Sequence, residues 1–334
     1  MLITGCHRSG TSLLASLLVD VLGHHRPDDL APAPDNPRGF FESRSLTTFN
    51  DQLLASLGGD WCHPPLLPPR WSESPLLDQI SAQRHQFAAY ASRRDWVDKD
   101  PRLCITLPAL QHLLLCRVPV LVSLREPLEV AASLQLRNGF AIERGLAIWF
   151  LYNHHLAAAL QTSDQLLTYA DLIQAVSDPA AAQRVLDRLG GFLGGHGYAV
   201  PSLAAWTQIL AQRVEPGLNR AAQLAQDPEP DRTRVSQPLL QLVQEAYRQA
   251  SCGVPGHRQA FGSLPRPILE LCEQLQLCAP GVVQHQRCLD RDQALAECRD
   301  QLAWEQQRLH ALQRSTSWQL TAPLRSLMDW RRRR

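Results

Sequence analysis

Residues 1–14 have the sequence M-L-I-T-G-C-H-R-S-G-T-S-L-L. The apolar run at residues 2–4 predicts a short buried strand, and the apolar positions 13, 14, 17, 18 and 21 recur at helical spacing. Residues 5–12 join the two as a glycine-containing turn. Backbone N–H groups in such a turn converge on an anion, and the positive end of the helix dipole adds to the attraction. The stretch therefore predicts a phosphate-binding loop between a strand and a helix.

The turn matches only part of the phosphate loop of nucleotide triphosphatases. Gly5 and Gly10 have the G-x-x-x-x-G spacing, and Ser12 occupies the hydroxyl position. The lysine that reaches the terminal phosphates of ATP or GTP is replaced by Thr11, which argues against nucleotide triphosphate hydrolysis. Arg8, inside the loop, supplies a cation in its place.

Length and composition limit the function classes. The chain has 334 residues and a formal net charge of +1, so we expect no nucleic-acid partner. Its nine cysteines show no C-x-x-C pair or zinc spacing, which predicts buried thiols in a reducing compartment. No signal peptide precedes the first strand and no apolar run reaches membrane-spanning length, so we expect a cytoplasmic protein.

Further stretches repeat the order of strand, polar turn and helix. Apolar runs predict strands at residues 96–99, 118–124 and 166–169. Lys99 ends the first of these runs and Arg125 follows the second. Because ligands collect at the carboxyl ends of parallel strands, we expect both side chains near Arg8. The predicted fold class is α/β, with a P-loop-like parallel β-sheet flanked by helices and a helical C-terminal extension.

Glu42 follows a proline-rich loop and precedes a predicted helix at residues 46–57. One interpretation is a first-turn carboxylate favoured by the helix dipole. The other is a general base that the helix dipole holds ionised and that takes the proton of an acceptor hydroxyl. His24, His25 and Asp100 are alternative candidates for the base.

Three of these stretches resemble the sulfotransferase superfamily. Arg8-Ser9-Gly10-Thr11-Ser12 resembles the loop that holds the 5′-phosphosulfate of 3′-phosphoadenosine-5′-phosphosulfate (PAPS). Arg125, with Ser133 eight residues later, resembles the 3′-phosphate motif of the family. Lys99-Asp100-Pro101 is similar to a Lys-Asp-Pro turn of the tyrosylprotein sulfotransferases. Residues 169–172, Y-A-D-L, match a Tyr-Glu-Asp-Leu stretch that follows the fourth strand, with Ala170 in place of the acid.

The resemblance implies a co-substrate and a set of site residues. PAPS would be the co-substrate, no metal would be needed, and a hydroxyl would accept the sulfuryl group. The implied catalytic residues are Glu42, Lys99 and Arg8. The implied PAPS-binding residues are Arg8, Ser9, Gly10, Thr11, Ser12, Arg125, Ser133, Arg137 and Tyr169.

Two rival functions stay open. A P-loop kinase or NTPase would need a Mg²⁺ ligand, for which Asp98 is the candidate. A non-catalytic scaffold would keep the nucleotide fold without turnover. The acceptor is expected to be a saccharide, because the tail resembles tails of bacterial glycan-modifying transferases; a protein tyrosine or a small metabolite are the alternatives.

The expected domains are a sulfotransferase domain at residues 1–265 and a helical tail at 266–334. Leu295, Leu302 and Leu309 lie seven residues apart, which predicts a short coiled coil. The chain ends with an apolar stripe and a run of arginines. Residues 288–334 are therefore expected to contact a coiled-coil partner or the surface of an acidic membrane.

Overall fold

The computed structural model describes residues 1–22, 30, 41–65, 71–88, 90, 96–214, 235–277 and 282–314. Its contacts divide the chain into two compact units, Met1–Pro280 and Gly281–Arg334. Among the described helices, none combines the length and the hydropathy that a bilayer span requires.

The first unit is built on a parallel sheet of four strands. In chain order these are β1 (Leu2–Thr4), β2 (Asp98–Lys99), β3 (Val120–Leu124) and β4 (Gln165–Thr168), and their order in the sheet is β2-β1-β3-β4. Ile3 pairs with Lys99 on one side and with Leu121 on the other. The predicted α/β class with a parallel sheet flanked by helices is confirmed.

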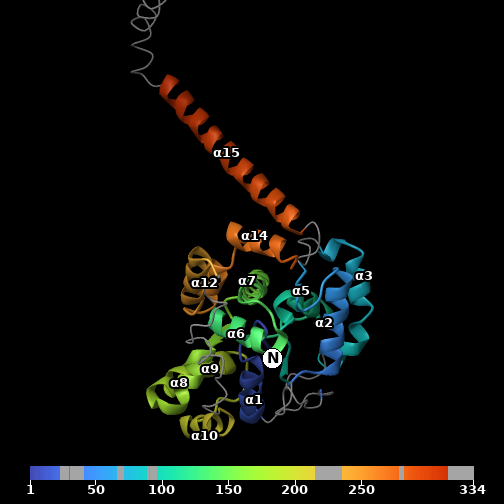
Figure 1. Cartoon of the computed structure of the whole chain (residues 1–334), viewed down its shortest axis with the longest axis vertical. Helices are drawn as coiled ribbons and strands as arrows, with labels where there is room; N and C mark the ends of the chain where they lie inside the picture. Colours follow the sequence, from blue (N-terminus) through green and yellow to red (C-terminus); the bar gives the residue numbers. More distant parts are fainter. Residues whose placement is uncertain are drawn as a thin grey trace, which may run out of the picture. The chain divides into compact units, whose positions relative to one another are not determined.

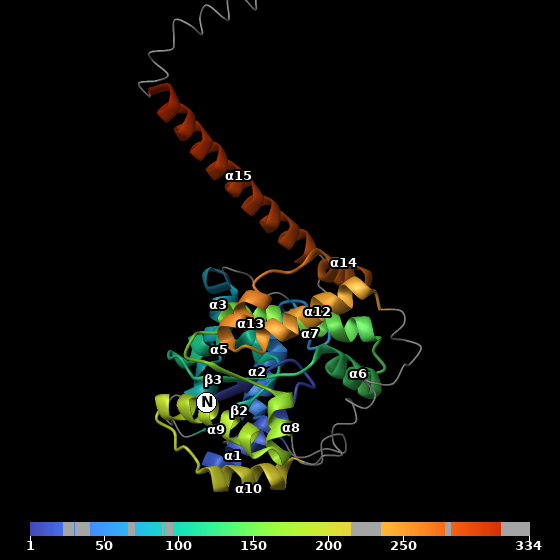
Figure 2. The ribbon, with the colours of Figure 1, turned by 90° about the vertical axis from the view of Figure 1, so that its left-hand side faces the viewer.

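Helices connect the strands and cover both faces of the sheet (Figures 1 and 2). Figure 2 shows α1, α8, α9 and α10 on one side of the strands and α5, α7 and α13 on the other. The helices of this unit are α1 (Thr11–Leu22), α2 (Arg44–Ser56), α3 (Leu76–Ser81), α5 (Leu103–Leu114), α6 (Pro127–Asn138), α7 (Ile142–Ala159), α8 (Tyr169–Ser177), α9 (Pro179–Gly195), α10 (Leu203–Arg213), α12 (Gln237–Ala250), α13 (Val254–Ala260) and α14 (Arg266–Gln274), with 3-10 turns η1 (Trp71–Glu73) and η2 (Arg84–Phe87).

The core forms because alternate strand residues face one layer of helices. Ile3, Leu121 and Leu167 are fully buried and belong to one apolar cluster with Leu14 of α1 and Trp206 of α10. Burial of such side chains stabilises a fold by about 1.5–3 kcal/mol each. The packed sheet thereby fixes the carboxyl ends of its strands, where the polar turns begin.

Helix α14 and helix α15 belong to different units. α14, which the sequence analysis assigned to the tail, buries Ile268 and Cys272 within the first unit. In the second unit, α15 (Val282–Arg314) exposes Leu295 and Leu302, at 49% and 59%. The coiled coil stays a prediction, and the basic end at 315–334 lies outside the described residues.

The prediction of buried thiols holds for only some of the described cysteines. Cys6, Cys104 and Cys272 are buried, but Cys116, Cys252 and Cys298 are exposed.

Candidate functional site

The loop between β1 and α1 depends on its two glycines. Gly5 and Gly10 have φ angles of +148° and +86°, in the range that favours glycine. A Cβ atom at Gly5 would lie 2.2 Å from the backbone oxygen of Ser123, and one at Gly10 would lie 2.4 Å from Cδ2 of Tyr169. The loop therefore passes close to the ends of both β3 and β4.

The carboxyl end of β3 holds the loop in place. The hydroxyl of Ser123 donates a hydrogen bond to the backbone oxygen of Ser9 (2.7 Å), and Arg125 Nη1 donates one to the backbone oxygen of Arg8 (3.0 Å). Arg8 itself has φ +68°, an uncommon angle for a residue other than glycine. Ser123 was missed by the sequence analysis, since its role depends on which strand lies beside β1.

The two predicted anion sites are contiguous. Arg8 Nε donates a hydrogen bond of 2.9 Å to the hydroxyl of Ser133 on α6. Ser133 is 6% exposed, whereas Arg8 is exposed. The structure therefore brings together the predicted 5′-phosphosulfate loop and the predicted 3′-phosphate motif.

The other predicted loop residues lie at the start of α1. Thr11 is the first residue of α1 and is buried, and Ser12 follows it half-buried. The buried hydroxyl of Ser9 has no hydrogen-bond partner within the described part of the chain.

Arg125 lies between an acid and an aromatic ring. Its Nε donates to Glu129 Oε2 (2.8 Å), and its guanidinium carbon is 4.2 Å from the centroid of the Tyr169 ring. Such a stacked cation and ring attract each other. Arg125 thus lies at the carboxyl end of β3, as predicted from its place in the sequence. Its neighbour Glu129 was not predicted from the sequence.

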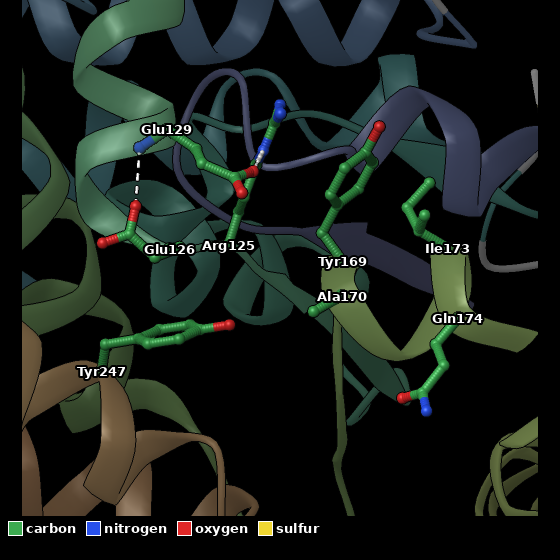
Figure 3. Close-up of a pocket in the computed structure, with 8 residues that line it drawn as sticks. All are labelled: Arg125, Glu126, Glu129, Tyr169, Ala170, Ile173, Gln174 and Tyr247. Atoms are coloured by element: carbon green, nitrogen blue, oxygen red, sulfur yellow. Dashed lines mark hydrogen bonds and ion pairs between the residues drawn. The ribbon is translucent and has the colours of Figure 1, made fainter. Parts of the chain in front are cut away.

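Arg125 and Tyr169 line a cavity of about 330 Å³. Figure 3 shows Tyr169 and other residues of α8 on one side of it and Tyr247 of α12 on another, its hydroxyl directed toward Ala170. The full lining consists of Arg125, Glu126, Glu129, Tyr169, Ala170, Ile173, Gln174 and Tyr247. Rings and hydrogen-bonding groups around a cavity of this kind are typical of small-ligand sites.

Lys99 and Glu42 form a buried ion pair at the end of β2, with Lys99 Nζ on Glu42 Oε1. Lys99 is 2% exposed and Glu42 is 9% exposed. Among the 33 lysine and arginine residues of the chain, Lys99 is the only lysine. Lysine and arginine differ in shape and donor geometry, so a single buried lysine indicates a position that an arginine does not satisfy.

The helix-dipole interpretation of Glu42 is wrong. Ser43, not Glu42, is the N-cap of α2, and its hydroxyl accepts from the backbone N–H of Leu46. Burial raises the pKa of Glu42, and Lys99 acts in the opposite direction. The ion pair, rather than the helix, therefore favours the charged form of this carboxyl.

A second cavity, of about 180 Å³, lies beside this pair. It brings together the predicted residues Arg8, Glu42 and Arg137. The full lining consists of His7, Arg8, Glu42, Trp61, Arg102, Leu134, Arg137 and Asn138. Three guanidinium groups around so small a space indicate an anionic ligand.

Neither Arg102 nor His7 was assigned to the site from the sequence, although both line this cavity. Burial opposes the charge of Arg102, but the carboxylates of Asp100, Asp51 and Glu42 outweigh it and raise its pKa. Arg102 contacts Asp51 at 2.8 Å and Asp100 at 2.9 Å.

His7 is held between rings in its neutral form. Burial and the nearby cations, Arg102 first, lower its pKa well below the usual value. Its ring lies 4.8 Å from that of Trp61 and 5.3 Å from that of Tyr152. Its buried Nε2 has no hydrogen-bond partner among the described residues.

Within the described ranges, one group of potential metal ligands lies close together: Asp60, Cys62 and His63. His63 Nε2 faces Arg144 Nη2 at 2.9 Å, so the imidazole accepts there and carries its proton on Nδ1, toward Asp60. A protonated Nδ1 offers no lone pair to a metal ion. The absence of a metal from the reaction stays a prediction.

Comparison with known proteins gives a limited result. No family model and no curated protein matches the chain. Among solved structures, the chain is similar to the sulfotransferase domain from the Synechococcus PCC 7002 olefin synthase, with a TM-score of 0.39 and 17% sequence identity over 74% of this chain and 93% of that one. A likeness of this strength assigns no activity, so function is inferred from the site itself.

Proposed function

We propose that the protein is a sulfotransferase that moves the sulfuryl group of PAPS to an acceptor hydroxyl. The observation that carries the proposal is the meeting of cationic groups at three adjacent strand ends. The glycine loop follows β1, Lys99 ends β2 and Arg125 follows β3. Arg8 and Ser133, in direct contact, join the loop to the element that follows β3.

The donor would lie across both cavities. The loop amides, Arg8 and Thr11–Ser12 would bind the bridging 5′-phosphate, which is the leaving group. Arg125 and Ser133, with Arg137, would bind the 3′-phosphate, and Tyr169 would face the nucleoside. The larger cavity, beside Arg125 and Tyr169, has room for the nucleoside part.

The chemistry needs a base and a cation at the sulfur. The acceptor oxygen attacks sulfur, the bond from sulfur to the phosphate oxygen breaks, and the acceptor proton passes to Glu42. Lys99 has three N–H donors, and among the described residues one of them contacts Glu42; the other two would serve the sulfuryl or leaving oxygen. Charge stabilisation by such a preorganised donor is worth roughly a hundredfold or more in rate.

The structure disfavours the kinase alternative. Asp98, the candidate Mg²⁺ ligand, is fully buried, and both its oxygens accept hydrogen bonds from protein groups. It therefore has no oxygen directed to a nucleotide-bound metal.

A saccharide is the acceptor class that we propose. The smaller cavity combines the indole of Trp61 with hydrogen-bonding side chains of Arg102 and Asn138, which suits a ligand with both apolar and hydroxyl faces.

We also propose that residues 288–334 contact a coiled-coil partner or an acidic membrane surface.

Incubation of the full chain with PAPS labelled in the sulfuryl group tests the activity. A panel of saccharide, tyrosine-peptide and small hydroxyl acceptors would be screened for label transfer. We expect transfer to a saccharide, a loss of about a hundredfold in Glu42→Gln, and near wild-type donor affinity in that variant. Magnesium-dependent turnover of ATP, or no label transfer to any acceptor or to water, would contradict the proposal.

A further inference from the structure

A buried network lies directly behind the Lys99–Glu42 pair and has no role in the mechanism above. Asp98, the first residue of β2, is fully buried. Its Oδ1 accepts the backbone N–H of Ser43 (3.1 Å) and the backbone N–H of Lys99 (2.8 Å). Its Oδ2 accepts the hydroxyls of Ser43 (2.5 Å) and Tyr90 (2.6 Å).

The two amides on Oδ1 belong to the segments that carry the pair. Ser43 directly follows Glu42, and Lys99 directly follows Asp98. One carboxylate oxygen therefore joins the start of α2 to the end of β2, which are more than fifty residues apart in sequence. No hydrogen bond of the sheet does this, since β2 pairs with β1.

We propose that Asp98 is a positioning residue that sets Glu42 and Lys99 opposite each other for sulfuryl transfer. Glu42 follows Phe41, whose φ of +57° is uncommon for a bulky residue, so the local backbone does not by itself favour this geometry. The four hydrogen bonds of Asp98 supply the restraint. A base and a cation held in place before the substrate arrives act without reorganisation.

The Asp98 side chain is chemically suited to accept four hydrogen bonds. Two amides and two hydroxyls all donate to it, which is the pattern expected for an ionised carboxylate. An amide at this position would present a donor to the two hydroxyls instead, and the network would have to rearrange. Burial raises the pKa of Asp98 to about 6, with the hydrogen bonds from Ser43 and Tyr90 opposing the shift.

This inference rests on the proposed function for its catalytic part, but the geometry can be tested independently. Because Lys99 is the only lysine, the full chain labelled with ¹⁵N-lysine gives one side-chain ammonium signal. That signal reports directly on the pairing with Glu42. We would compare the wild type, Asp98→Asn, Ser43→Ala and the conservative Ser43→Thr.

Thr106→Val is the matched control. Thr106 on α5 donates to Asn50 on α2 (2.6 Å), so it anchors the same helix at a point away from Glu42. This variant removes the contacts of the Thr106 hydroxyl with Asn50 and with the backbone oxygen of Arg102 (3.1 Å) without touching the network of Asp98. The Thr106→Val variant is expected to keep the lysine signal and the turnover of the wild type.

Asp98→Asn and Ser43→Ala are expected to shift or broaden the lysine signal and to lower the turnover of labelled PAPS at least tenfold. Their affinity for 3′-phosphoadenosine-5′-phosphate (PAP) should stay within about threefold, and Ser43→Thr should restore both readouts. An unchanged lysine signal in Asp98→Asn and Ser43→Ala would overturn the inference, as would an equal loss of PAP affinity and turnover. A wild type that shows no PAPS turnover, with a lysine signal that responds to Asp98→Asn, would refute the proposed function and leave the positioning of the pair supported.

Discussion

Replacement of Lys99 by methionine should reveal the charge of the buried pair through the pH dependence of stability. Methionine keeps an unbranched side chain of similar length but removes the ammonium group. The change leaves Glu42 at 9% exposure without the cation that opposes the burial effect on its pKa. Breaking a buried ion pair from one side costs about 3–5 kcal/mol, a large share of a typical 5–15 kcal/mol of stability.

The sign of the pH effect follows from the pKa of Glu42. Without Lys99 the folded-state pKa of Glu42 rises further above its unfolded value of 4.5, so the variant favours the protonated carboxyl. The folded variant is then least penalised below pH 4.5 and loses stability as the pH rises toward the new pKa, by up to about 1.4 kcal/mol per pH unit. We expect the loss of unfolding free energy in Lys99→Met to be larger at pH 8 than at pH 5.

Urea denaturation at both pH values measures this difference. Arg184→Met is the control, since Arg184 lies at 62% exposure beside Asp178 on the surface, where an ion pair contributes less than about 1 kcal/mol. A loss in Lys99→Met of less than about 1 kcal/mol at pH 8, or a loss that is the same at pH 5, would refute the charged pair.

Three other predictions address the loop, the nucleotide cavity and the helical core. Gly10→Ala would place a Cβ atom 2.4 Å from Tyr169 at a φ of +86°, so we expect calorimetry to show at least a tenfold loss of PAP affinity. An unchanged affinity would show that the loop does not bind the nucleotide in this conformation. Glu129→Gln should strengthen PAP binding several-fold, because the carboxylate that competes for Arg125 is neutralised; weaker binding would instead make Glu129 a support of the site. Burial lowers the pKa of His257 from 6.5 to about 3, so the stability contributed by the neutral imidazole is present above pH 6.5 and is lost as the pH falls. Between pH 6.5 and 4 the wild type should therefore lose unfolding free energy more steeply than His257→Gln, and equal slopes would contradict this.

The sequence predicted the sheet because its strands are apolar runs that end in polar turns. That periodicity also placed Lys99 and Arg125 at strand ends, where the structure has them. The ion pair of Lys99 with Glu42 was not predicted, although both were named as catalytic residues, because the charge of Glu42 was attributed to the local helix dipole. Burial and a partner 57 residues away in sequence decide its charge instead.

Residues that act through tertiary contacts gave no local signal. Asp98 was considered as a metal ligand, yet its oxygens bind the start of α2. Arg102 and His7 stood beside predicted residues in the sequence, but their common cavity depends on the packing of α6. The composition did contain one indication of the site, namely the single lysine, Lys99, among many arginines.

Titration calorimetry of the full chain with PAP and with 5′-AMP tests the central claim most directly. Only PAP carries the 3′-phosphate that Arg125 and Ser133 would bind, through charge-assisted hydrogen bonds worth about 1.5–3 kcal/mol each. We predict that PAP binds at least tenfold more tightly than 5′-AMP and that Arg125→Ala with Ser133→Ala removes the difference. Equal affinities of the wild type for the two nucleotides would contradict the account.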